Sequence, residues 1–391
     1  MTRKYSLASN TWDEKEKLSI LRVLESNQFT MGKEVDEFEN MFSEYLGTKH
    51  SIMVNSGSSA NLLACAAFKL SGKYKNGTVI APAVSWSTTF FPISQWGYKI
   101  KFLDINIRSL NIDIAEIKKN ITTDVVGICG VSLLGNPSGM DEIRNICNQH
   151  NLFFFEDNCE SFGASIKGIL AGSFGDISTH SFFFSHHMQT MEGGMVSTND
   201  DALASIIRSL RAHGWTRDKK SGDLSDIAFD NFSKSFEFIY PGYCVRPIEF
   251  MGAVGKVQLS KWPLMKQKRL ENAFNFKKMM SEFNEIFTIQ SDQGVESTWF
   301  GFSIILIGKA TGNRSLLVNI FEKHNIEYRP IVAGNFTKQK VIQYLNHFPL
   351  SNYPNADQVD ENGIFVGNDS RDLRDELSLL KDALLEFSLK L

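Results

Sequence analysis

The first 250 or so residues alternate apolar runs of strand length with amphipathic runs of helix length. Three of the apolar runs lie at 78–81, 125–129 and 152–155, and residues 140–150 between the last two have the mixed pattern of a helix. Strands that are apolar on both faces, separated by helices, are typical of a parallel sheet covered on both sides. This alternation predicts an α/β fold with a large, mostly parallel sheet.

The remaining third of the chain predicts a smaller unit. Residues from about 255 to 287 are charged and helical, and a strand, a helix, a second strand and a final amphipathic helix are expected at 299–307, 314–324, 327–332 and 371–389. A long helix joining two units fits this order. We therefore expect a large α/β domain over residues 1–255 and a smaller α+β domain over residues 256–391.

The overall charge and composition exclude several classes of function. The chain has 391 residues, of which 42% are hydrophobic, and a formal net charge of -3. This balance provides no general basic field for nucleic acid or for a membrane surface. No apolar stretch reaches the roughly 18 residues of a membrane span, and the N-terminus lacks a signal peptide's apolar core, so a cytoplasmic location is expected. The five cysteines form no C-x-x-C pair and are expected to be free thiols.

Two motifs predict binding groups at strand ends. In residues 55–61, Asn-Ser-Gly-Ser-Ser-Ala-Asn, a strand end turns into a helix start, whose free N–H groups and dipole favour a phosphate. Gly57 permits close approach and Ser58 offers a donor, although a simple serine N-cap is the alternative. Asp157 follows the apolar run 153–155 and would lie at the ligand-binding edge of a parallel sheet. A capping or salt-bridged aspartate is the alternative there.

Two further features are aromatic. Trp86, in Pro-Ala-Val-Ser-Trp-Ser, follows a strand and would stack on a flat ring, with ordinary core packing as the alternative. His186 and His187 follow the run 181–184 and precede a Glu-Gly-Gly turn. Neighbouring side chains of an extended segment point to opposite sides, which disfavours joint binding of one metal. A histidine at the ligand edge suits proton transfer near neutral pH; we expect this of His186 and a buried structural role for His187.

In order and spacing, these motifs resemble the sugar aminotransferase branch (DegT/DnrJ/EryC/StrS) of the fold-type I pyridoxal enzymes. The resemblance implies an aminotransferase-like fold and a pyridoxal phosphate cofactor. In that family the catalytic lysine lies six residues before the glutamate of the Glu-Gly-Gly turn. Counting six back from Glu192 gives His186, and no lysine occurs between Lys167 and Lys219.

The block 182–194, with its paired histidines, resembles the GDP-4-keto-6-deoxymannose 3-dehydratases of that family, which serve colitose and O-antigen biosynthesis. The resemblance implies a homodimer and a set of site residues. It assigns Gly57, Ser58 and Ser181 to the cofactor phosphate, Trp86, Asp157 and Glu160 to its ring, His213 and Arg246 to glutamate or sugar, and Asn27, Gln28, Phe29, Thr30, Arg217 and Arg329 to the nucleotide sugar. Cys244 stands where the family usually has an asparagine that reaches the neighbouring subunit's phosphate, which puts that contact in doubt.

The implied reaction follows from the histidine. Lysine forms a Schiff base and moves protons, whereas imidazole only moves protons, so pyridoxal or pyridoxamine phosphate would be bound noncovalently. The resemblance implies that His186 then serves removal of the C3 hydroxyl from a nucleotide-linked 4-keto-6-deoxy sugar. Glutamate would be the amino donor, and ammonia and a 3,6-dideoxy-4-keto sugar the products.

Several alternatives stay open at this point. The chain could be a nucleotide-sugar 4-aminotransferase that uses a lysine from elsewhere, or a catalytically silent sugar- or cofactor-binding regulator. A branch acting on CDP-sugars also carries histidine for lysine, but it needs an iron–sulfur cluster, which the scattered cysteines disfavour. GDP and CDP are not distinguished by these residues.

Overall fold

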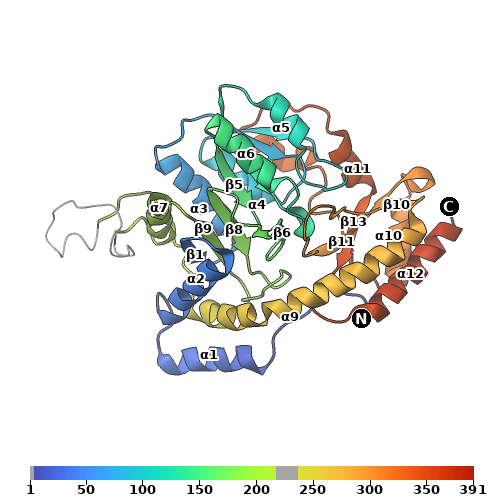
Figure 1. Cartoon of the computed structure of the whole chain (residues 1–391), viewed down its shortest axis with the longest axis horizontal. Helices are drawn as coiled ribbons and strands as arrows, with labels where there is room; N and C mark the ends of the chain where they lie inside the picture. Colours follow the sequence, from blue (N-terminus) through green and yellow to red (C-terminus); the bar gives the residue numbers. More distant parts are fainter. Residues whose placement is uncertain (1–3, 217–236) are drawn as a thin grey trace.

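The computed structural model describes residues 4–216 and 237–391, and its larger unit is built on a seven-stranded sheet (Figure 1). Its strands are β1 (His50–Val54), β2 (Thr78–Pro82), β3 (Lys99–Leu103), β4 (Val125–Val131), β5 (Phe153–Asp157), β8 (Ile177–Ser181) and β9 (Gly194–Thr198). They lie in the order β1-β9-β8-β5-β4-β2-β3. Neighbours from β3 to β8 pair in parallel, while β9 is antiparallel to both β8 and β1. The predicted α/β fold with a mostly parallel sheet is confirmed.

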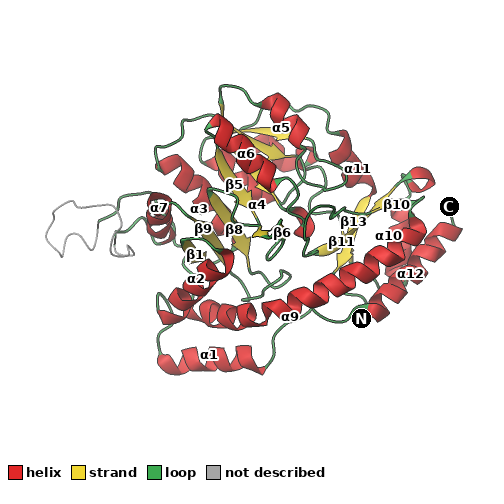
Figure 2. Ribbon diagram, in the orientation of Figure 1, coloured by secondary structure: helices red, strands yellow, loops and turns green. Residues whose placement is uncertain are grey.

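Helices cover both faces of this sheet (Figure 2). One face carries α3 (Gly57–Leu70), α4 (Ser87–Gln95) and α7 (Asp201–Arg211), and the other carries α5 (Ile114–Asn120) and α6 (Met140–His150). The phenylalanines of β5 alternate between them, because Phe153 and Phe155 pack in the core with α3 whereas Phe154 packs in the core with α6. Burial on both sides explains why this strand is apolar at consecutive positions. A small hairpin, β6 (Ser165–Ile166) and β7 (Ile169–Leu170), follows β5.

The smaller unit holds a second sheet in which every pairing is antiparallel. Its strands are β10 (Phe287–Thr288), β11 (Gly301–Leu306), β12 (Tyr328–Arg329) and β13 (Gly363–Gly367), in the order β10-β11-β13-β12. Helices α10 (Arg314–Lys323) and α12 (Arg374–Leu389) pack on this sheet, and α11 (Pro354–Asn362) precedes β13. The strand predicted at 327–332 is wrong in extent, because Pro330 has no N–H to donate and Val332 has a φ of 51°.

Helix α9 (Glu249–Met280) connects the two units (Figure 1). Its first half packs against α1 (Glu14–Ser26) and α2 (Lys33–Leu46), and Phe276 in its second half belongs to the core of the smaller unit. The helix runs without a break through residues 255 and 256, so the division into domains at that point stays a prediction. None of the helices in the described part of the chain has both the length and the apolar character of a membrane span.

Candidate active site

A hollow of about 690 Å³ opens where the carboxyl ends of β5 and β8 meet the start of α3. This is the edge at which open α/β sheets bind ligands. Eight of the residues predicted from sequence line it: Gly57, Ser58, Trp86, Asp157, Glu160, Ser181, His186 and Arg329. The fold therefore brings together side chains from segments that are far apart in the sequence.

The deepest charged group in this hollow is the carboxylate of Asp157, which is 5% exposed. Its Oδ2 accepts hydrogen bonds from Asn61 Nδ2 at 3.0 Å and from Thr89 Oγ1 at 2.7 Å, and its Oδ1 accepts from the backbone N–H of Cys159 at 3.2 Å. Three donors from three elements therefore fix the orientation of the carboxylate. Such a carboxylate is suited to pair with a cationic ring nitrogen, because its own hydrogen bonds offset the cost of burying its charge.

Glu160 lies beside Asp157 at the same edge. The pKa of Glu160 is raised to about 7, because burial and the nearby Asp157 charge outweigh the lowering effect of the hydrogen bond from the Leu134 N–H. That bond joins Leu134 N to Glu160 Oε2 at 2.9 Å. Near neutral pH this carboxyl is able to share a proton with an oxygen of a bound ring.

The start of α3 forms a cradle for an anion. Ser56 caps the helix by accepting from the Ser59 N–H, and Ser58 Oγ donates to Thr88 Oγ1 at 3.1 Å. A Cβ added at Gly57 would lie 2.7 Å from the Ser181 Cβ, so only glycine fits this close approach of backbone to β8. Unpaired N–H groups at a helix start together with two serine hydroxyls suit a phosphate. The residues present therefore fit the phosphate and ring of a pyridoxal cofactor.

Trp86 precedes α4 and projects into the hollow. It is 58% exposed, which is unusual for the largest apolar side chain in a folded chain. An exposed aromatic side chain in the hollow that Asp157 also lines suits stacking on a flat ring, and the alternative of core packing is wrong for this residue.

His186 closes the other side of the hollow and is held by aromatic rings. Its ring centroid lies 5.2 Å from that of Phe300 and 6.1 Å from that of Phe183, both edge-to-face. Among the described residues no protein group forms a hydrogen bond with its Nδ1. Burial and, after it, the charge of Arg269 lower the pKa of His186 to about 4. The imidazole is therefore neutral at pH 7 and ready to accept a proton.

His187 differs from its neighbour. It is 1% exposed, lies edge-to-face on Trp262 with ring centroids 5.6 Å apart, and does not line the hollow. Its ring also contacts Phe300 at 5.8 Å, because the segment turns after β8 instead of staying extended. The lining of the hollow, within the described ranges, includes no lysine.

The other predicted residues lie outside this hollow. Residues 27–30 are exposed and pair with the segment before α9, where Thr30 bridges to Ile248 and the Glu249 N–H donates to the Phe29 carbonyl at 2.9 Å. These residues are Asn27, Gln28, Phe29 and Thr30. Arg246 is close to them, with Nη1 3.6 Å from Met31 Sδ and Nη2 3.5 Å from Cys244 Sγ.

The His213 N–H donates to the Tyr243 carbonyl at 2.7 Å and its ring packs on Trp215, so it lies near the exposed Cys244 and not in the hollow. Arg217 lies outside the described residues.

Four residues of the hollow or its support were missed by the sequence reasoning. Asn61 and Thr89 hold Asp157, and both end or follow motifs that were already singled out. Glu327 accepts from the Leu7 N–H at 3.1 Å and pairs with Arg329 at 3.4 Å. Phe300, which contacts both histidines, carries no local signal in the sequence.

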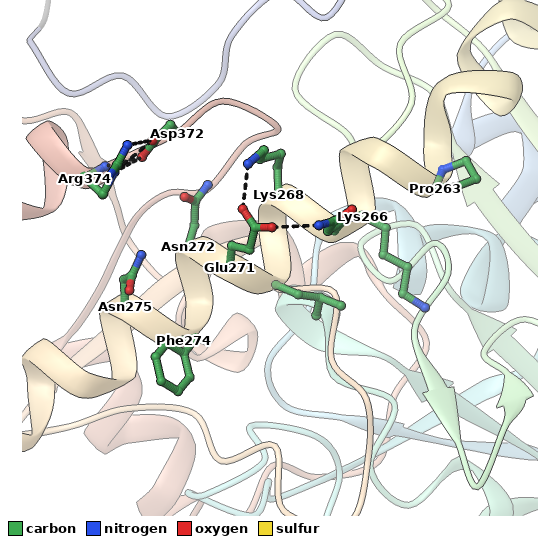
Figure 3. A pocket seen from close by; sticks show the side chains of 11 residues that line it. Pro263, Lys266, Lys268, Glu271, Asn272, Phe274, Asn275, Asp372 and Arg374 are labelled. Carbon is green, nitrogen blue, oxygen red and sulfur yellow. Dashed lines mark hydrogen bonds and ion pairs between the residues drawn. The ribbon is translucent and has the colours of Figure 1, made fainter.

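A second depression, of about 880 Å³, lies on the outer side of α9 (Figure 3). Its charged side chains are held in ion pairs, as in Lys268–Glu271 at 2.7 Å and Arg374–Asp372. Exposed ion pairs of this kind are weak and leave no unsatisfied charge for a ligand. Within the described residues, no group of three or more His, Cys, Asp or Glu side chains is placed to hold a metal ion.

The model of the DegT/DnrJ/EryC1/StrS aminotransferase family matches residues 10–371. The chain belongs to this family. The predicted resemblance is therefore confirmed at the level of the family.

Individual relatives are more specific. A GDP-4-keto-6-deoxy-D-mannose 3-dehydratase of Yersinia pseudotuberculosis is 45% identical over 386 residues, which cover 97% of this chain and 98% of that protein. A solved structure of GDP-4-keto-6-deoxymannose-3-dehydratase with bound GDP-perosamine matches with a TM-score of 0.91 at 43% identity. Another, with a trapped PLP-glutamate geminal diamine, matches with a TM-score of 0.92 at 43% identity. Each of these two matches covers 97% of this chain and 100% of the other.

Proposed function

We propose that this chain is a 3-dehydratase that removes the C3 hydroxyl of a nucleotide-linked 4-keto-6-deoxyhexose, GDP-4-keto-6-deoxy-D-mannose. The observation that carries the proposal is His186, which faces the hollow six residues before Glu192, in a lining without lysine among the described residues. Relatives named for this activity match nearly the whole chain, which supports the choice of substrate. When bound, pyridoxamine phosphate supplies an amine for the sugar ketone and an electron sink for loss of the hydroxyl.

The residues at the start of α3 would hold the cofactor phosphate. Gly57 leaves room for close approach, and the hydroxyls of Ser58 and Ser181 lie on the same side of the hollow. A helix N-terminus stabilises an anion through its unpaired N–H groups and its dipole. Binding by these contacts requires no covalent bond to the protein, which agrees with the absence of lysine from the described lining.

Asp157, Glu160 and Trp86 would hold the cofactor ring. Asp157 keeps a proton on the ring nitrogen, because its carboxylate is fixed by Asn61, Thr89 and the Cys159 N–H. Glu160, whose pKa is raised to about 7, shares a proton with the ring hydroxyl. Trp86 offers its exposed face for stacking.

His186 would move the protons of the reaction. Its neutral imidazole accepts a proton from a carbon acid in the hollow, and the resulting imidazolium returns a proton to the departing C3 hydroxyl. A lysine at this position would add a covalent attachment that the imidazole cannot form. The histidine therefore favours loss of the hydroxyl over amination of C4.

The nucleotide sugar and glutamate would occupy the remaining surface. Arg329 lines the hollow beside Glu327 and is placed to contact the sugar or its diphosphate. Residues 27–30, together with His213, Cys244 and Arg246, lie outside the hollow of their own chain. We propose that they complete the site of the neighbouring subunit in a homodimer, and that the enzyme works in the cytoplasm.

A coupled assay tests this function. The purified chain is incubated with pyridoxal phosphate, glutamate and GDP-4-keto-6-deoxy-D-mannose, and ammonia, 2-oxoglutarate and the sugar product are measured. The proposal predicts equal amounts of ammonia and 3-deoxy sugar, and 2-oxoglutarate formed at the same rate. Formation of a 4-amino sugar without free ammonia would instead identify an aminotransferase, and binding without any turnover would identify a silent regulator.

A further inference from the structure

The orientation of the His186 ring depends on one aromatic side chain from the smaller unit. Phe300 contacts the rings of both His186 and His187, and it lies directly before β11. Its own N–H donates to the Leu134 carbonyl at 3.0 Å, which ties it to the large sheet's side of the hollow. Since His186 Nδ1 has no hydrogen-bond partner among the described residues, ring packing is the contact that orients it.

The backbone that presents Phe300 is strained. Trp299 has a φ of 48°, in the left-handed region that bulky side chains avoid. A conformation of this kind persists only where surrounding contacts hold it, and such residues gather at functional sites. Tight packing is part of the restraint, because a Cβ on Gly135 would lie 2.3 Å from the Trp299 nitrogen.

The carbonyl of Trp299 is held by two side chains. Arg269 Nη1 donates to it at 3.2 Å from α9, and Asn368 Nδ2 donates to it at 2.8 Å from the residue that follows β13. Asn368 also contacts the Arg269 carbonyl at 3.4 Å. This turn contains a left-handed residue whose carbonyl accepts two hydrogen bonds. These contacts fix the turn in one conformation, and Phe300 is fixed with it.

Arg269 brings a charge as well as a hydrogen bond. It is 3% exposed, and burial lowers its pKa only to about 10, so the guanidinium is charged at neutral pH. The acidic group whose charge opposes this lowering is Asp369, whose carboxylate forms an ion pair with Arg371. Burying a guanidinium costs free energy of desolvation, and one hydrogen bond to a backbone carbonyl offsets only part of that cost. A second role for Arg269 would explain why a charge is buried here.

The charge of Arg269 lowers the pKa of both histidines. Burial is the first cause that lowers the pKa of His186 and of His187, and Arg269 is the second for each. On its open side His186 faces the hollow, whose charged and titratable groups are Asp157, Cys159, Glu160, Glu192, Glu327 and Arg329. On its closed side it faces Phe300, His187 and, behind them, Arg269.

We propose that Arg269 is a positioning residue for His186. Arg269 fixes the Trp299–Phe300 turn against the imidazole and places a permanent positive charge behind the ring. The inference rests on the proposed function, because it takes His186 as the group that moves the proton. A purely structural arginine, joining α9 to the start of β11, is the competing explanation. The two differ in what they predict for the titration of His186.

The experiment compares Arg269→Met, which removes the charge, with Arg269→Lys, which keeps it and loses the planar fork. Phe300→Leu loosens the packing against the imidazole and leaves Arg269 in place. Lys268→Ala, one residue away on the exposed side of α9, is the matched control (Figure 3). The His186 pKa is followed by NMR on chain labelled at histidine, with His186→Asn to assign the signal, and kcat and KM are measured in the coupled assay.

In Arg269→Met the pKa of His186 should rise, and in Arg269→Lys it should stay close to that of the wild type. Both variants, and Phe300→Leu, should lower kcat by about tenfold to a hundredfold with KM changed by less than about threefold, because misplacing a reacting group acts on the chemical step. Lys268→Ala should match the wild type in every measurement. Should Arg269→Met not fold, Arg269→Lys and Phe300→Leu still decide the positioning role through kcat.

Two results overturn the inference. One is a folded Arg269→Met whose His186 pKa and kcat equal those of the wild type. The other is unchanged kcat in both Arg269→Lys and Phe300→Leu. Failure of the proposed function is distinguishable, because it appears as full turnover in His186→Asn or as a 4-amino sugar from the wild type, whatever the Arg269 variants do.

Discussion

The two sides of the hollow are held by different kinds of contact. At the carboxyl end of β5, Asp157 receives three hydrogen bonds, from Asn61, Thr89 and the Cys159 N–H. Across the hollow, His186 is held by the rings of Phe183 and Phe300, and its Nδ1 has no partner in the described part of the chain. One side fixes a charge through hydrogen bonds, and the other orients a neutral imidazole through ring packing.

This difference matches the two tasks of the proposed reaction. A group that stabilises a cationic ring must keep its charge and orientation throughout, and preorganised hydrogen bonds achieve this. A group that accepts and returns protons must keep its orientation while its protonation changes. Aromatic packing supports the second task, because it orients a ring without engaging the nitrogen that carries the proton.

The largest expected effect is on the histidine side. His186→Asn should lower kcat by about 10³-fold, within the range that general acid–base groups contribute, and should leave cofactor binding nearly unchanged. His187→Asn, whose ring does not line the hollow, should cost far less turnover. The measurement is kcat in the coupled assay beside a cofactor titration by absorbance. Equal losses in the two variants would remove the distinction between the neighbouring histidines.

The carboxylate side should respond in both binding and rate. Asp157→Asn is expected to lower kcat by about 10²-fold and to weaken cofactor binding, because a preorganised charge is lost from a buried position. Thr89→Val removes one of the three donors and should have a smaller effect of the same kind. An Asp157→Asn chain that binds and turns over like the wild type would contradict the assignment.

The two sides also predict a pH dependence. Because the pKa of His186 is lowered to about 4, its imidazole stays neutral, and kcat should not fall on its account until the pH approaches that value. The free energy of unfolding should also fall at low pH. A histidine buried in its neutral form contributes stability that is fully present above about pH 6.5 and is lost as the pH falls through about 4. Chemical denaturation at several pH values should show this loss, reduced in His186→Asn. An acid limb of kcat near pH 6.5 that persists in variants at the other titratable residues of the hollow would contradict the lowered pKa of His186.

The smallest effect is expected at the exposed aromatic face. Trp86→Ala should weaken cofactor binding by about tenfold, equal to roughly 1.4 kcal/mol, the order found for an aromatic stacking contact. Trp86→Phe keeps a ring and should recover most of the affinity. A cofactor titration by fluorescence checks both, and equal affinity in all three chains would exclude stacking.

Much of the fold follows from local patterns. The consecutive phenylalanines of β5 predict a strand buried on both faces, and Phe153 and Phe154 do pack in different cores. The helix expected at 140–150 has those bounds as α6. The strand expected at 327–332 is shorter, because Pro330 and Val332 interrupt the backbone in ways that apolar periodicity does not record.

The site was predictable where a motif carries its own chemistry. The Gly57 cradle, Asp157 and His186 each lie within a motif, and the fold brings them together. Phe300 and Arg269 carry no such signal, because their importance depends on a turn with a left-handed tryptophan that forms only when α9 meets the second sheet. Contacts between distant segments of this kind are absent from any local pattern.

The central claim, that His186 moves the protons of a C3 deoxygenation, is tested most directly by the structure of the sugar product. Chain loaded with pyridoxamine phosphate is mixed with GDP-4-keto-6-deoxy-D-mannose in a single turnover, and the product is identified by mass spectrometry and NMR for the wild type and for His186→Asn. The account predicts a sugar that has lost the C3 oxygen with the wild type, and unchanged substrate with His186→Asn. A product that keeps its C3 oxygen and carries nitrogen at C4, or full deoxygenation by His186→Asn, would contradict it.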